Sequence, residues 1–172
     1  MMQCAILVNG DVKYTRKLLD SAFFRDIEGF HMAGVVASAP ESLALNRARN
    51  LHIPTFIVEE KMFPNGNSYG VALLNKLKDI DSDFVVADGM IPVPPCVCKH
   101  YNGRLLRVKL TPVGQTMEIV AYLSDAAGGI GQVMGEATAA LEADDTQDSF
   151  TRRVYDLAEG LIMDAVESCC GE

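Results

Sequence analysis

The chain has 172 residues, of which 49% are hydrophobic and 22% charged, a balance that favours one globular domain over residues 1–172. Its formal net charge of −8 argues against a nucleic-acid-binding surface and against electrostatic docking on an anionic membrane. No apolar run reaches the roughly 20 residues that a membrane-spanning helix needs, and no basic segment precedes the apolar N-terminal stretch. Five cysteines without a regular spacing favour reduced thiols in the cytoplasm.

Apolar runs alternate with helical spacings through the first half of the chain. Short, nearly continuous apolar runs are typical of strands that are buried on both faces of a parallel sheet. The predicted strands are 4–8, 32–37, 53–58 and 84–87, and the predicted helices between them lie around 18–23, 42–51 and 71–78. This strand–helix alternation indicates a parallel sheet that is covered by helices.

The second half of the chain follows a different order. Prolines 92, 94 and 95 predict a loop, and the strands predicted at 104–110 and 118–122 are joined by a link too short for a parallel crossover. A further strand is predicted at 132–140, and a terminal helix at 144–160 and 161–168 with Thr146 or Asp145 as its N-cap. The expected fold class is therefore α/β, with a mostly parallel, Rossmann-like sheet flanked by helices and an antiparallel edge.

Segments spread over the whole chain are similar to one known family. They are 5–10, 46–49, 52–55, 61, 63–64, 83–90, 103–106, 145–150 and 153–154. Their order is that of the family, and their spacing is nearly ungapped through residue 106. The chain thus resembles the folate-dependent formyltransferases, most closely the phosphoribosylglycinamide formyltransferases of purine synthesis. The resemblance implies the formyltransferase sheet as the fold, and 10-formyltetrahydrofolate or a related folate as the cofactor.

The family uses an Asn, a His and an Asp around the transferred formyl group, and none of the three is matched here. The family motif places the Asn and the His two residues apart on one strand, where this chain has Arg107 and Lys109. The Asp belongs to an Asp-Thr-Gly-Pro turn that this chain lacks, and Asp125, the nearest acid, falls a few positions early. Positioned donors and acid–base groups each contribute about 10²–10⁴-fold to a rate, so we expect formyl transfer to be lost.

The family's phosphate loop is also changed. That loop reads Gly-Asn-Gly-Ser-Asn and binds the substrate phosphate through backbone N–H groups. Residues 10–14 here read Gly-Asp-Val-Lys-Tyr, in which Asp11 would repel a phosphate and Lys13 would offset part of the repulsion. The short segment 111–116 replaces a longer stretch of the family, so we expect part of the substrate-binding wall to be missing.

The candidate ligand-binding residues follow from the same resemblance. They are Gly10, Lys13, Asp88, Gly89, Met90, Ile91, Val93, Arg107 and Lys109. Residues 88–93 lie where the family's main chain lines the pterin pocket, and the alternative is a plain loop capped by Pro92. Arg107 and Lys109 share one strand face, as an anion-binding pair or as two side chains that reach solvent. We expect an anion, or an acidic side chain such as Asp125, within hydrogen-bonding reach of one of them.

The cysteines do not predict a metal site. Cys96, Cys98 and His100 are close in sequence, but a C-x-C spacing does not fit the paired C-x2–4-C pattern of structural zinc sites. Buried free cysteine is a common small hydrophobe. The glycine-rich segment 128–131 is not a dinucleotide fingerprint either, because no strand–turn–helix unit with a later acid surrounds it.

Three classes of function remain open from the sequence. In the first, which is our main prediction, the chain has lost formyl transfer and keeps a folate- or anion-binding, or regulatory, role. In the second, it is an active transferase with an altered substrate that uses Lys109, Arg107 or Asp125. In the third, it is a protein-interaction module that uses residues 92–95 or an exposed strand edge. The expected partner is a small molecule, without nucleic acid or membrane, and the sequence is compatible with a homo-oligomer.

Overall fold

One seven-stranded sheet runs through residues 1–171, the part of the chain that the computed structural model describes. The strands are β1 (Met2–Val8), β2 (Phe30–Ala37), β3 (Thr55–Ile57), β4 (Phe84–Ala87), β5 (Leu105–Val113), β6 (Thr116–Ser124) and β7 (Ile130–Ala140). The helices are α1 (Arg16–Phe24), α2 (Leu43–Asn50), α3 (Gly66–Asp79), α4 (Pro95–His100) and α5 (Gln147–Cys170), with a 3-10 turn at Glu60–Met62. The strand order is β3-β2-β1-β4-β5-β6-β7. All pairs from β3 to β5 are parallel and the last two are antiparallel, which confirms the predicted fold class.

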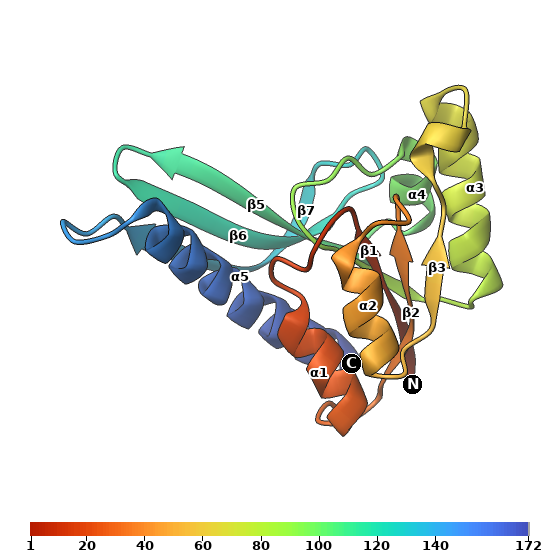
Figure 1. The fold of residues 1–172 in the computed structure, drawn as a ribbon, viewed down its shortest axis with the longest axis horizontal. Helices are drawn as coiled ribbons and strands as arrows, with labels where there is room; N and C mark the ends of the chain where they lie inside the picture. Colours follow the sequence, from red (N-terminus) through yellow and green to blue (C-terminus); the bar gives the residue numbers. More distant parts are fainter. Residues whose placement is uncertain (172) are drawn as a thin grey trace.

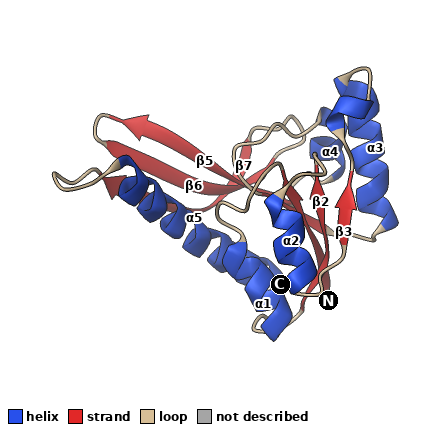
Figure 2. Ribbon diagram, in the orientation of Figure 1, coloured by secondary structure: helices blue, strands red, loops and turns tan. Residues whose placement is uncertain are grey.

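Helices cover both faces of the sheet, so the protein has two apolar cores (Figures 1 and 2). One core lies under α1, α2 and α5 and includes Ile6 and Val86; the other lies under α3 and α4 and includes Leu7 and Val85. Successive residues of a strand point to opposite faces of the sheet, so the side chains of the parallel strands alternate between the two cores. This arrangement explains why those strands are continuous apolar runs in the sequence.

The antiparallel hairpin is tighter than the sequence predicts. β5 runs through Val113 and β6 begins at Thr116, so most of the predicted link is strand and only two residues form the turn. Gly114 in that turn has a φ of 60°, which favours glycine. Pro112 lies in β5 beyond Leu106, the last residue that pairs with β4. That side of β5 therefore has no neighbouring strand, and the missing N–H of proline is tolerated.

Two helices also differ from the prediction. α4 begins inside the proline-rich segment that predicted a loop, because Pro95 occupies the first turn, where its missing N–H is not needed. α5 begins at Gln147 and ends at Cys170, later at both ends than the predicted terminal helix, and Thr146, one of the two predicted N-caps, is its N-cap. The Thr146 hydroxyl accepts a hydrogen bond from the Ser149 N–H, and the Ser149 hydroxyl accepts one from the Thr146 N–H.

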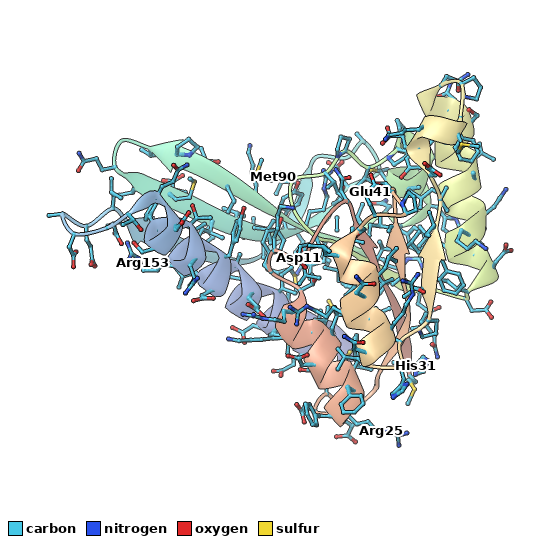
Figure 3. All side chains as sticks on the ribbon, in the orientation of Figure 1. Asp11, Arg25, His31, Glu41, Met90 and Arg153 are labelled. Carbon is cyan, nitrogen blue, oxygen red and sulfur yellow. The ribbon has the colours of Figure 1, made fainter. Side chains whose placement is uncertain are left out.

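An ion pair holds the corner between β7 and α5. Arg153 pairs with Asp145 and also donates to the carbonyl oxygen of Ala140 at 2.7 Å. The Arg153 guanidinium, followed by the Glu142 N–H, lowers the pKa of the Asp145 carboxyl. Arg153 lies near the start of α5, away from Asp11 and Met90 (Figure 3). Within residues 1–171, no helix has the length and apolarity needed to cross a membrane.

Candidate functional site

The predicted ligand-binding residues lie mainly where β1, β4 and β5 come together, and two loops carry most of them. Residues 9–15 follow β1 and lead into α1, and residues 88–94 follow β4 and lead into α4. Figure 3 labels Asp11 on the first loop and Met90 on the second. Open α/β sheets bind ligands at this edge, beyond the carboxyl ends of their parallel strands. A cavity of about 340 Å³ is lined by Asn9, Lys13, Tyr14, Gly89, Met90, Ile91, Leu110 and Tyr155.

Asp88 joins the two loops. Its carboxylate accepts hydrogen bonds from the backbone N–H of Lys13 at 2.8 Å and of Tyr14 at 2.9 Å. The residue is 1% exposed. Burial raises the pKa of this carboxyl, and the two N–H groups and the Lys13 ammonium oppose the rise. Gly89 follows with a φ of 85°, and a Cβ there would lie 3.2 Å from Cδ of Lys13, so the Lys13 side chain lies across this glycine.

The loop before α1 is held by further internal hydrogen bonds. The N–H of Val12 donates to Oδ1 of Asp11 at 2.8 Å, so three successive N–H groups of this loop are bound by carboxylates of the chain. Gly10 takes part through its carbonyl oxygen, which accepts from the Ser42 hydroxyl and anchors the loop to the start of α2. Groups of the chain itself therefore fix the position of the loop.

Arg107 and Lys109 play different parts although they share a face of β5. Arg107 is half-buried, and its Nη2 donates to the carbonyl oxygen of Ile91 at 2.9 Å. It therefore ties the loop at 88–94 to β5. Lys109 is exposed, and its side chain has no hydrogen bond or ion pair within the part of the chain that the structure describes. The predicted pair is thus divided between a bound guanidinium and an ammonium that reaches solvent.

Asp125 pairs with neither cation, which corrects our expectation of an acidic partner. Its Oδ1 accepts hydrogen bonds from the N–H groups of Ala127 at 3.0 Å and Gly129 at 2.8 Å. The glycine-rich turn after β6 offers these N–H groups close at hand, so the carboxylate is satisfied locally. Only the ion pair at the start of α5 is formed within residues 1–171. Arg107 and Asp125 nevertheless both lie close enough to Cys98 to shift its pKa in opposite directions, although burial is the larger influence and raises it.

The cysteines of α4 have a packing role. Cys98 is buried, and its Sγ lies 3.8 Å from the carbonyl oxygen of Val93, to which it donates a weak hydrogen bond. Val93 thus contributes through its backbone to the position of α4. Within residues 1–171, no group of three or more His, Cys, Asp or Glu side chains is arranged to hold a metal ion.

Sequence reasoning missed part of the cavity lining. Tyr14 is fully buried, and its ring packs edge-on against Tyr155 of α5 with the ring centroids 6.0 Å apart. The Tyr14 hydroxyl lies near the Gly89 backbone, and burial, with the Asp88 carboxylate nearby, raises its pKa. Tyr155 lies far along the chain from the loops that it faces, so no local spacing in the sequence could have placed it there.

We expect Arg107→Ala to destabilise the protein by about 1–2 kcal/mol, because it leaves the Ile91 carbonyl oxygen without its charged donor. Lys109→Ala is the matched control on the same strand face, and its expected change is within about 0.5 kcal/mol. Chemical denaturation of both variants measures the difference. Equal losses in the two variants would contradict the structural role that we assign to Arg107.

The strand order and the position of the cavity define an α/β protein with the Rossmann-like formyltransferase fold. No protein-family model matches the chain. The chain is 26% identical to the phosphoribosylglycinamide formyltransferase of Escherichia coli (strain K12), over 89% of this chain and 80% of that protein. It is 24% identical to the trifunctional purine biosynthetic protein adenosine-3 of Drosophila melanogaster, over 88% of this chain and 12% of that much longer protein.

A solved structure with the same fold is glycinamide ribonucleotide transformylase 1 from Symbiobacterium toebii. It superposes with a TM-score of 0.88 and 17% identity, over 99% of this chain and 88% of that chain. The chain therefore resembles phosphoribosylglycinamide formyltransferases in sequence and has their fold, and the resemblance predicted from the sequence is confirmed.

Proposed function

We propose that the chain is a formyltransferase-fold protein, acting as one domain, that has lost formyl transfer and keeps a small-molecule-binding or regulatory role. The observation that carries this proposal is the hydrogen bond of 2.9 Å from Arg107 to the Ile91 carbonyl oxygen. Arg107 stands at the strand position where the family holds its Asn donor. Its guanidinium is positioned by the protein's own backbone, and a long cationic side chain stands where the family has a short, neutral amide that polarises the formyl oxygen.

The other two catalytic positions support the same proposal. Lys109 replaces the family's His and is exposed, so a flexible aliphatic amine stands where the family has an imidazole ring. Asp125 closes its own turn through two hydrogen bonds. These hydrogen bonds hold the Asp125 carboxylate within its own turn. The three positions thus do not reproduce the Asn, His and Asp of the family.

The cavity supports a retained binding role. Its volume of about 340 Å³ is at the low end of the ~300–1,000 Å³ range typical of ligand pockets. A pterin-sized ring fits that volume better than a whole folate. Gly89, Met90 and Ile91 line the cavity, and Gly89 can contribute only backbone there, which makes recognition tolerant of changes of side chain. A reduced folate such as 10-formyltetrahydrofolate is therefore our proposed ligand, with the ring bound in this cavity.

We expect calorimetry with tetrahydrofolate and 5-formyltetrahydrofolate to show saturable binding. Leu110→Trp would fill the cavity from β5 and should weaken binding by about tenfold or more, since it blocks space that the ring needs. Val113→Trp is the matched control, because Val113 is an exposed residue of the same strand outside the cavity lining. No saturable heat with either folate would count against a retained folate site. Equal weakening by both variants would place the ligand elsewhere.

We also infer a cytoplasmic location. Within residues 1–171, Cys4, Cys96, Cys98 and Cys170 are free thiols. Free thiols persist in reducing compartments, whereas oxidising compartments favour disulfides. Redox-sensitive labelling of the protein in intact cells would test this location.

A further inference from the structure

The loop between β1 and α1 has the backbone form of an anion site. Successive backbone N–H groups of a loop can converge on one point, and such concave groups bind phosphate, sulfate or carboxylate. Here the N–H groups of Lys13 and Tyr14 converge on one carboxylate, with N···O distances of 2.8 and 2.9 Å. The anion that they hold is the side chain of Asp88, which the chain supplies itself from the end of β4.

Several features make this internal carboxylate hard to replace. Asp88 is 1% exposed, so an incoming anion would have to expel a buried side chain from its hydrogen bonds. The neighbouring N–H of Val12 is also bound, by Asp11, whose carboxylate adds a second negative charge beside the loop. The Lys13 side chain lies across Gly89 and balances part of this charge. A phosphate that approached the loop would meet two carboxylates and no free N–H among residues 12–14.

We propose that Asp88 sets the ligand specificity of this site. Its carboxylate occupies the position that an anionic group of a ligand would take. The adjoining cavity therefore selects ligands that carry no phosphate beside the β1–α1 loop. The proposal rests on the proposed binding function, and it narrows that function, because an anionic group cannot enter at the β1–α1 loop. The cavity is lined by residues of the same loop, Lys13 and Tyr14, so a ligand seated there lies directly beside the filled amides.

The test is an amide NMR titration of the isotopically labelled protein with inorganic phosphate, against sodium chloride at matched ionic strength. In the unmodified protein, we expect no saturable shift of the Lys13 and Tyr14 amide signals. In Asp88→Ala, these two signals should shift saturably, with phosphate affinity about tenfold or more above that of the unmodified protein. Phosphate should also raise the Tm of Asp88→Ala, and chloride at the same ionic strength should not.

Asp83→Ala is the matched control. Asp83 is an exposed residue just before β4, and its carboxylate also accepts a backbone N–H, from Gln3, but it lies at the opposite end of the strand. This variant removes the same charge and should gain no phosphate binding. Asp88→Ser provides a second, smaller change if Asp88→Ala does not fold.

Three results would overturn the proposal. They are phosphate binding at the Lys13 and Tyr14 amides of the unmodified protein, absence of binding in folded Asp88→Ala or Asp88→Ser, and an equal gain in Asp83→Ala. A negative folate titration would count against the proposed function, but it would produce none of these three results, because the NMR experiment measures the binding of inorganic phosphate.

Discussion

The chain, supplied with 10-formyltetrahydrofolate and phosphoribosylglycinamide, should transfer no formyl group above the rate of the uncatalysed control. A positioned donor and a positioned acid–base group each contribute about 10²–10⁴-fold, so losing both lowers the rate by about 10⁴-fold or more. Arg107 is positioned by the Ile91 carbonyl oxygen and Asp125 by its own turn, so neither is presented as the neutral amide or the acid that the family uses. The filled loop at Lys13 and Tyr14 removes binding of the acceptor phosphate as well.

A steady-state assay with the Escherichia coli phosphoribosylglycinamide formyltransferase as the positive control measures this directly. Arg107→Asn combined with Lys109→His should not restore turnover. The double variant still lacks the Asp of the family, and the Lys13 and Tyr14 amides are still bound by Asp88. Ordinary turnover by the unmodified chain would contradict the proposed loss of activity. Turnover with another amine acceptor that falls in Lys109→Ala would instead favour an active transferase with an altered substrate.

The parallel half of the fold could be predicted because its signal is local. A short apolar run such as 84–87 is typical of a strand that is buried on both faces of a parallel sheet, and each of its residues is buried in the structure. The convergence of Lys13 and Gly89 could also be predicted, because the carboxyl ends of parallel strands meet at one edge. The start of α4 was mispredicted because proline is common in two settings. It is frequent in loops, and it is also favoured in the first turn of a helix, where Pro95 lies.

The partners of the charged side chains could not be predicted. Asp88 is separated by 75 residues from Lys13, and Arg107 by 16 residues from Ile91, and no sequence period links such positions. Asp125 shows the opposite case, since its N–H partners lie within four residues and a glycine-rich turn should have suggested them. A resemblance to a family places side chains on strands, but it does not say whether the protein's own backbone already binds them.

Leu106→Ala should be among the most destabilising single changes in β5, with an expected loss of about 2–5 kcal/mol in the free energy of unfolding. Leu106 is fully buried, pairs with Val86 of β4 and belongs to the core under α5. Removing its side chain leaves a cavity at the centre of the sheet, where strands on both sides limit any collapse.

This variant also tests the register on which the site rests. A shift of β5 by one residue would exchange its two faces, and Arg107 would then enter the core under α5. Thr111→Ala, farther along β5 and beyond its pairing with β4, is the control, and its expected change is about 1 kcal/mol or less. Urea denaturation of both variants gives the comparison. A loss below about 1 kcal/mol for Leu106→Ala would mean that the strand is registered differently, and that Arg107 does not face the Ile91 carbonyl oxygen.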